Sequence, residues 1–214
     1  YSEYIKLSMK IRNKEIISLF DVKNVKVLPK KAINTGMLTW ADQILVGTNG
    51  TRQKINNQMR FLLERGPLPE NGDKVICLRN YWDDFSENGD PLINGTIGYL
   101  KNPFETFYTV PRFIKTDNRR LDIINSNIVI DEETSFNNIF IDKQMITKGV
   151  RCCDWKVAYQ LVKLKNKIGD VVPKEFAYAY AITGHKSQGS EWDKVLVIEE
   201  SFPFDKVEHA RWLY

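Results

Sequence analysis

The sequence lacks several features that would assign it to a class at once. No apolar run approaches the roughly 18 residues that span a membrane, and no charged-then-apolar leader opens the chain. The two histidines, His185 and His209, are not spaced as zinc ligands. These absences argue against a membrane protein, a secreted protein and a zinc site, so we expect a cytoplasmic protein with no metal ligands of its own and no membrane partner.

Cysteine is also scarce. Cys77, Cys152 and Cys153 make an odd count, and no CxxC spacing occurs. Neighbours in sequence rarely bridge each other, which leaves no disulfide framework to propose. We expect all three to be reduced structural thiols, as is usual in the cytosol.

The charge balance is mildly basic, with a net charge of +4 and a pI of about 8.8. That balance permits a polyanionic partner without requiring one. At 214 residues the chain is long enough for two compact units. It starts at Tyr1 without methionine and ends in the helix-like "EHARWLY". We therefore expect a piece of a longer protein.

Secondary-structure patterns are clearest before residue 70. "EYIKLSMKIRNKE" alternates like a strand, but its residue types favour a helix, which we predict. Gln43 to Gly47 predicts a short strand, followed by a turn and then a helix that Thr51 caps. Apolar residues recur at helical spacing in the helix, and Gly66 and Pro67 end it. This is a strand–turn–helix unit of an α/β layer.

Beyond residue 70 the pattern of apolar and polar residues changes twice. From about Asn71 to Asp170 the pattern predicts mostly short strands, arranged as a small barrel, with Asn94-Gly95 as a hairpin turn. "WKVAYQLVKLK" fits a helix or an extended arm equally well. Phe176 to Ile182 and Lys194 to Glu199 then predict two buried strands. The predicted fold class is α/β, with a β-rich module at 71–170 inserted between 1–70 and 171–214.

The stretch "GHKSQGSE" raises a chemical question. Gly184 and Gly189 are spaced as in a phosphate-binding loop, but the lysine and hydroxyl that should follow are Ser190 and Glu191. A carboxylate there would repel phosphate. A second possibility is the turn that carries a nucleophilic serine, here Ser187, although its first glycine is replaced by histidine.

A third possibility comes from resemblance. "AYAITGHKSQGSEWDKVLVIEE" resembles motif V of superfamily 1 helicases, in the branch of RecD (the exodeoxyribonuclease V alpha subunit) and Dda. "IKLSMKIRNKE" is similar to the opening helix of the second motor domain of that branch, and "ADQILVGTNGTRQKINNQMR" to its motif IVa. "NGDKVICLRN" and "INGTIGYL" resemble the start of its SH3-like insertion, and "EHARWLY" resembles the run-in to motif VI.

The resemblance implies a fold and an activity. It implies a RecA-like, P-loop NTPase-type second motor domain without its own P-loop, interrupted by an SH3-like barrel. The parent would be an ATP-dependent DNA helicase moving 5′ to 3′ on single-stranded DNA. ATP and Mg²⁺ would be shared with the N-terminal motor domain, which supplies the Walker motifs, so this chain alone is expected to lack ATPase activity.

The resemblance also implies roles residue by residue. It places Thr48, Asn49, Thr183, His185 and Lys186 on DNA. It places Gln188, Gly189 and Glu191 on the nucleotide side, with Glu191 near the ribose. It implies no catalytic residue and no metal ligand within this chain. Hydroxyls, amides and a helix start at the ends of adjacent strands are good phosphate donors.

Simpler interpretations stay open. Thr183 fits a helix cap, His185 and Asn49 fit structural positions, and Ser187 and Gln188 fit a helix surface. Three basic residues favour a solvated helix face over a DNA patch: Arg52, Lys54 and Arg60. Three aromatics favour packing over base stacking: Tyr81, Trp82 and Phe85. The alternative function is a single-stranded nucleic-acid binding module without a motor.

Overall fold

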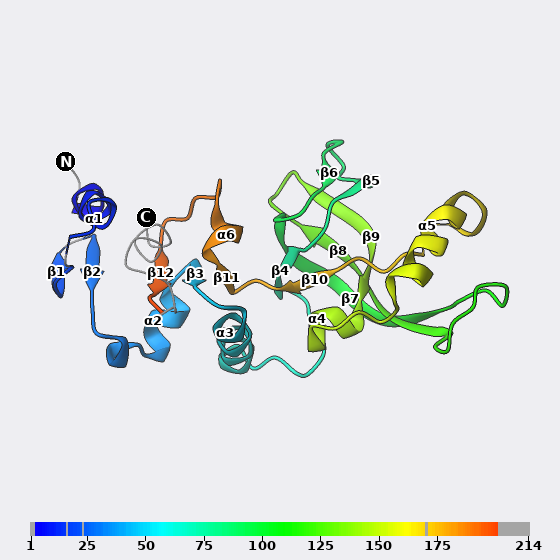
Figure 1. Ribbon diagram of the computed structural model, residues 1–214, viewed down its shortest axis with the longest axis horizontal. Coiled ribbons are helices and arrows are strands. Elements are labelled where there is room, and N and C mark those ends of the chain that lie inside the picture. The colour runs from blue at the N-terminus through cyan, green and yellow to red at the C-terminus, as the bar shows by residue number, and fades with distance from the viewer. Residues whose placement is uncertain (1–2, 16, 23, 170, 201–214) are drawn as a thin grey trace. The chain divides into compact units, whose positions relative to one another are not determined.

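The computed structural model describes residues 3–15, 17–22, 24–169 and 171–200, and it shows a mixed α/β chain (Figure 1). The chain divides into two compact units. Unit 1 comprises Tyr1–Met59 with Ala181–Tyr214, and unit 2 comprises Arg60–Tyr180. The units thus change at 59–60 and 180–181, where the sequence pattern placed the changes at 70–71 and 170–171. No helix among the described residues is both long and apolar enough to cross a membrane.

A three-stranded parallel sheet forms the centre of unit 1. Its order is β11 (Ala181–Thr183), β3 (Gln43–Val46) and β12 (Val195–Ile198). Val46 at the end of β3 lies opposite Thr183 on one side and Ile198 on the other. Because parallel strands in register finish together, all three carboxyl ends lie at one edge of the sheet.

Helix α3 (Asn49–Leu62) follows β3 after a two-residue turn. The prediction that Thr51 caps this helix is wrong. The hydroxyl of Thr48 accepts a hydrogen bond from the Thr51 N–H at 3.2 Å, which makes Thr48 the cap. The reason is that Asn49 and Gly50, expected in the turn, are already helical, so the cap falls three residues earlier.

The N-terminal part of unit 1 begins with helix α1 (Glu3–Arg12), as the residue types predicted against the alternating pattern. A hairpin of β1 (Phe20–Val22) and β2 (Val25–Val27) follows. The 3-10 helix η1 (Lys30–Ala32) and helix α2 (Thr35–Trp40) come next. The side chain of Asn34 caps α2 by accepting from the Met37 N–H at 3.0 Å.

Unit 2 is built on an antiparallel five-stranded sheet in the order β10-β4-β7-β8-β9. Its strands are β4 (Lys74–Cys77), β7 (Ile97–Thr109), β8 (Arg120–Val129), β9 (Ser135–Asp142) and β10 (Phe176–Tyr178). A bridge between Ile141 and Lys174 joins β9 to the segment that continues into β10. The first and last strands of the sheet are thereby linked. A separate pair, β5 (Tyr81–Phe85) and β6 (Pro91–Leu92), forms a second, two-stranded sheet.

Four strands of unit 2, β4, β5, β6 and β10, have five residues or fewer, but β7 has 13 and β8 has 10, which is longer than predicted. Two other details of the strand prediction are wrong. Asn94-Gly95 turns the chain, but it connects β6 to β7, which pair with β5 and β4 instead of each other. The run Phe176 to Ile182 forms two strands in different sheets, β10 and β11. An apolar run shows that its residues are buried, but not against which sheet.

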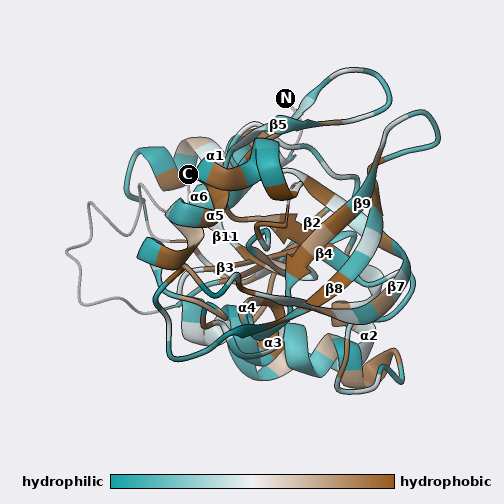
Figure 2. Cartoon of the chain, turned by 90° about the vertical axis from the view of Figure 1, so that its right-hand side faces the viewer, coloured by the Kyte–Doolittle hydropathy of each residue, from teal (hydrophilic) through white to brown (hydrophobic). Residues whose placement is uncertain are grey.

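The core of unit 2 has two hydrophobic clusters. One includes Val75, Leu100 and Ile128, and Figure 2 shows the hydrophobic stretches along β4 and β8. The other joins Leu121 on β8 to helix α5 (Trp155–Ile168). In α5 the buried residues are four apart, Val157 and Leu161, so this segment is a helix and the extended arm is excluded. A shorter helix, α4 (Lys143–Lys148), follows β9.

Arg60 and Asp73 form a buried ion pair in unit 2, so the prediction that Arg60 belongs to a solvated helix face is wrong. The Arg60 side chain is 8% exposed and that of Asp73 is 0% exposed. Two guanidinium nitrogens donate to the two carboxylate oxygens, each at 3.1 Å. The Arg60 guanidinium also lies 4.3 Å from the ring centroid of Tyr178. The sequence pattern placed Arg60 on the exposed face of the helix, but the side chain is buried because it pairs with the carboxylate of Asp73.

The three cysteines are free thiols, as predicted. Cys77 and Cys152 are buried, and Cys153 is half-buried. Among the residues that the structure describes, no three His, Cys, Asp or Glu side chains gather as a metal site would require.

Candidate nucleic-acid interface

The predicted DNA-side residues of unit 1 come from two neighbouring strands that finish at the same edge. Strand β3 leads through Gly47 and Thr48 into α3, and β11 leads through Thr183 into the short helix α6 (Gly184–Ser187), as Figure 1 shows. Strand β12 contributes Glu200, two residues beyond its end. The outer edge of a parallel sheet, beyond the carboxyl ends of its strands, is where α/β proteins generally bind ligands.

Glu200 occupies the turn between β3 and α3. Its carboxylate accepts from the N–H groups of Gly47 at 2.5 Å and Thr48 at 2.8 Å. It also accepts from the Thr48 hydroxyl at 3.0 Å and from the Thr51 hydroxyl. Four donors at a helix start form a strong anion-binding arrangement. In this structure the anion bound there is a side chain of the protein itself.

These contacts change the acidity of Glu200, which is 8% exposed. Desolvation by burial acts to raise the pKa of this carboxyl. The hydrogen bonds from Thr51, Thr48 and Gly47 together outweigh it, and the pKa of Glu200 is lowered. The group is therefore a carboxylate at neutral pH, and the turn carries a fixed negative charge.

Asn49, the second predicted DNA contact of this turn, is exposed at the first position of α3. Its side-chain oxygen accepts from the guanidinium of Arg52 at 3.2 Å. Arg52 is half-buried and Lys54 is exposed. Asn49 is therefore the first residue of α3 and not only a turn residue, and its side chain contacts Arg52 one helical turn further along.

The predicted contacts on the β11 side occupy the start of α6. Thr183 is the N-cap residue of α6 by position, but its side chain makes no capping hydrogen bond. His185 is exposed and Lys186 is half-buried. The geometry does not bear out Thr183 as a side-chain cap, and it leaves the His185 ring at the surface of the strand-end edge.

The predicted nucleotide-side residues lie on the loop that follows α6. Gln188, Gly189 and Glu191 are all exposed. Gly189 has a φ of 85°, a left-handed conformation that favours glycine. The hydroxyl of Ser187 donates to the carbonyl of Gly184 at 2.7 Å, so it serves the helix. His209, the base that a serine hydrolase would need, lies outside the described residues.

Asn56 fixes the position of β11 relative to α3. Its side-chain amide donates to the Ala181 carbonyl at 3.0 Å and accepts from the Ala181 N–H at 2.9 Å. The amide therefore supplies the two hydrogen bonds that a neighbouring strand would otherwise make. Asn56 is 3% exposed, so its polar atoms are buried together with their partners. Through this contact α3 holds the strand that leads to Thr183.

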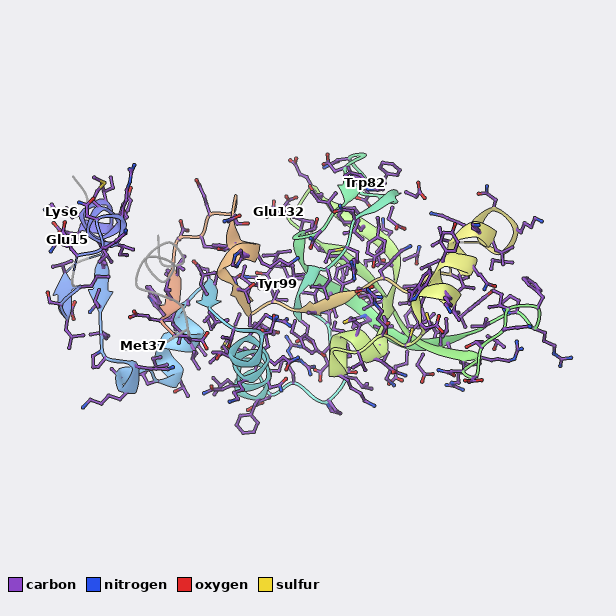
Figure 3. All side chains as sticks on the ribbon, viewed as in Figure 1. Lys6, Glu15, Met37, Trp82, Tyr99 and Glu132 are labelled. Atoms are coloured by element: carbon purple, nitrogen blue, oxygen red, sulfur yellow. The ribbon has the colours of Figure 1, made fainter. Side chains whose placement is uncertain are left out.

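The aromatic residues of β5 divide between packing and exposure. Tyr81 is half-buried, and its hydroxyl oxygen accepts from the Glu175 N–H at 2.7 Å, as the packing prediction expects. For the other two that prediction is wrong. Trp82 is 63% exposed and Phe85 is 58% exposed, and Trp82 extends outward from β5 in Figure 3. The strand lies in a two-stranded sheet, which covers little of its outer face.

Sequence reasoning missed Glu200 and Asn56. A signal existed for Glu200, because it follows a predicted strand at the edge where the other strand ends were expected to meet. No local signal marked Asn56, which looks like any polar residue on a helix surface. Both act across large sequence separations, 152 residues for Glu200 to Thr48 and 125 for Asn56 to Ala181.

Comparisons with known proteins give a match to a family model over part of the chain and a similarity to a solved structure. Residues 178–214 match the UvrD-like helicase C-terminal domain, a stretch that begins at the end of β10 and contains β11, α6 and β12. No curated protein sequence matches the chain. Among solved structures, the crystal structure of Pif1 helicase from Candida albicans matches with a TM-score of 0.45 and 15% identity, over 98% of this chain and 50% of that chain. The chain spans half the length of that structure.

Proposed function

We propose that this chain is the C-terminal motor portion of an ATP-dependent DNA helicase of superfamily 1, of the RecD and Dda type. One observation supports this above all. The segment that matches a helicase C-terminal domain places Thr183 at the same sheet edge as Thr48. In this proposal unit 1 is a RecA-like motor domain, and unit 2 contains an inserted SH3-like barrel.

The strand-end edge is the proposed contact for single-stranded DNA. Thr48, Asn49, Thr183, His185 and Lys186 would face the backbone, where hydroxyl, amide and cationic groups are suitable phosphate donors. The exposed positions of Asn49 and His185 support this role. Thr48 reaches phosphate only when its donors are released from Glu200, because those donors are occupied in the present structure.

The loop after α6 is the proposed nucleotide side. Gln188, Gly189 and Glu191 are exposed and carry an amide, an unhindered backbone and a carboxylate, which suit a ribose and its neighbouring groups. Binding and hydrolysis of ATP would supply the free energy for each cycle of opening and closing of the two motor domains. We assign the Mg²⁺ ligands to the N-terminal motor domain of the same protein, because the resemblance implies that this domain supplies the Walker motifs.

The experiment uses the complete protein, with duplexes carrying either a 5′ or a 3′ single-stranded tail. We expect ATP-dependent unwinding of the 5′-tailed duplex, because a protein that moves 5′ to 3′ along a single strand reaches the duplex from a 5′ tail. We also propose that the protein acts in the cytoplasm. We further expect Glu191→Gln to reduce strand-stimulated ATP hydrolysis, while Glu132→Gln, on an exposed turn of unit 2, leaves it unchanged. Strand binding without any ATP hydrolysis would favour a nucleic-acid binding module without a motor.

A further inference from the structure

Helix α5 of unit 2 presents two apolar faces. Val157 and Leu161 fill the core beneath it and are 1% and 0% exposed. Trp155, Tyr159 and Val162 recur at i, i+4 and i+7 on another face, and they are 64%, 54% and 52% exposed. A surface helix needs one apolar face for its own core. A second apolar face that exposes two aromatic rings to solvent is typical of a surface that binds a ligand or a partner molecule.

The charge of α5 indicates the sign of its partner. Residues 155–168 contain four lysines and no acidic residue: Lys156, Lys163, Lys165 and Lys167. Two of them lie at the exposed rings. The ammonium of Lys163 is 4.5 Å from the Tyr159 ring centroid, and that of Lys156 is 5.9 Å from the Trp155 ring centroid. Exposed rings with cations beside them favour a partner that has flat aromatic groups to stack on the rings and negative charges to pair with the lysines.

We propose that this surface, the α5 stripe of Trp155, Lys156, Tyr159 and Lys163, binds single-stranded nucleic acid. Bases would stack on the two rings, and the backbone phosphates would meet the two lysines. The rings are four residues apart, about 6 Å along the helix axis, so they can serve neighbouring bases of one strand. Stacking also explains why the exposed positions carry rings, because a base needs a π-face.

An acidic protein segment would also be attracted by the lysines, but it would use the stripe differently. A helix docking on α5 would bury Val162 as well as the two rings, since all three lie on one face. A nucleic acid gains stacking energy only from Trp155 and Tyr159. Replacing the aliphatic Val162 should therefore weaken binding of a protein helix but leave binding of a single-stranded nucleic acid unchanged.

This inference rests on the proposed function, because the strand is the one on which the motor would act. It concerns unit 2, whereas the proposed motor contacts belong to unit 1, so the two can fail separately. The test measures binding of a labelled oligothymidine to the complete protein by fluorescence anisotropy at two salt concentrations. Trp155→Ala and Tyr159→Ala should each weaken affinity about five-fold or more.

Two further variants examine the chemistry of the stripe. Trp155→Phe should retain most of the affinity, because it keeps a stacking face at the same position. Lys163→Gln should reduce the slope of log affinity against log salt by about one, as expected when one phosphate contact is lost. Two matched controls, Val162→Ala and Phe61→Ala, should bind like the original protein. Phe61 is 81% exposed at the end of α3 and stands outside the stripe.

The outcomes are distinct. If Trp155→Ala and Tyr159→Ala bind the oligonucleotide normally while the strand still stimulates ATP hydrolysis, the α5 stripe is not a strand contact and the proposed function stands. An equal loss of oligonucleotide affinity in Val162→Ala would mean that the effect does not depend on stacking on the two rings, and it would overturn the inference. If the complete protein binds no single strand at all, the proposed function fails together with the inference.

Discussion

The carboxylate of Glu200 accepts hydrogen bonds from both the N–H and the hydroxyl of Thr48, at 2.8 and 3.0 Å. This contact joins the residues that follow β12 to the turn that begins α3. The carboxylate is buried and anchors two strand ends of the parallel sheet, so it is both a structural link and a charge at the proposed phosphate site.

Replacing Glu200 should destabilise unit 1 in a pH-dependent way. We expect Glu200→Gln to lower the free energy of unfolding by about 1–3 kcal/mol at pH 7, because the four donors of the turn lose a charged acceptor. The folded pKa of Glu200 lies below the ordinary value of 4.5, so its contribution is complete above pH 4.5 and is lost as pH falls through the folded pKa. Urea unfolding of both proteins from pH 7 to pH 3 measures this, with Glu132→Gln as an exposed control.

The same variant should strengthen strand binding at the proposed interface. Glu200 places a negative charge where the proposal brings a phosphate, and Gln removes that charge while keeping an acceptor for the turn. We expect higher affinity for a labelled oligothymidine at low salt, with a smaller gain at high salt because of screening. Weaker binding by Glu200→Gln would mean that the carboxylate positions Thr48 for the strand instead of competing with it.

The buried pair of Arg60 and Asp73 predicts a large loss of stability in unit 2. Asp73 also accepts from the Glu70 N–H at 2.7 Å and the Tyr180 hydroxyl at 2.8 Å. Asp73→Ala leaves the guanidinium buried without its partner, so unfolding should become easier by about 3–5 kcal/mol. The control is Asp122→Ala, whose pair with Arg120 is exposed and should contribute less than about 1 kcal/mol. Similar losses for the two variants would contradict a special role for the buried pair.

Asn56 should matter far more than its neighbour. Asn56→Ala removes both hydrogen bonds to Ala181 and leaves buried backbone groups unsatisfied, at a cost of about 1–3 kcal/mol. Because Ala181 begins β11, which leads to Thr183, the affinity for single-stranded DNA should fall as well. Asn57→Ala, one position along on the exposed side of α3, should change neither property. Thermal unfolding and anisotropy on the same samples test both expectations.

Cys153 should be the most reactive thiol. The hydrogen bond with Cys152 lowers the pKa of Cys153 and raises that of Cys152. Cys153 is also more exposed than the buried Cys77 and Cys152. Alkylation by iodoacetamide at pH 7.5, followed by peptide mass spectrometry, should modify Cys153 first. In Cys152→Ala the hydrogen bond is gone, and the rate at Cys153 should fall; faster labelling of Cys77 would contradict the assignment.

The sequence by itself determined the local elements of this protein. The strand, turn and helix of residues 43–62 follow from a short apolar run, turn residues and helical spacing, and the residue types decided α1 against an alternating pattern. These features depend on neighbours within a few residues, which the sequence displays.

The tertiary structure alone decided the contacts that cross the chain. It assigned Phe176–Tyr178 and Ala181–Thr183 to different sheets, although they form one apolar run. It buried Arg60 against Asp73 and brought Glu200 onto the turn before α3. Helical or strand periodicity reports that a side chain faces inward or outward, but not which distant group meets it there. Those partners are fixed only when the two ends of unit 1 come together and the sheet of unit 2 joins its first and last strands.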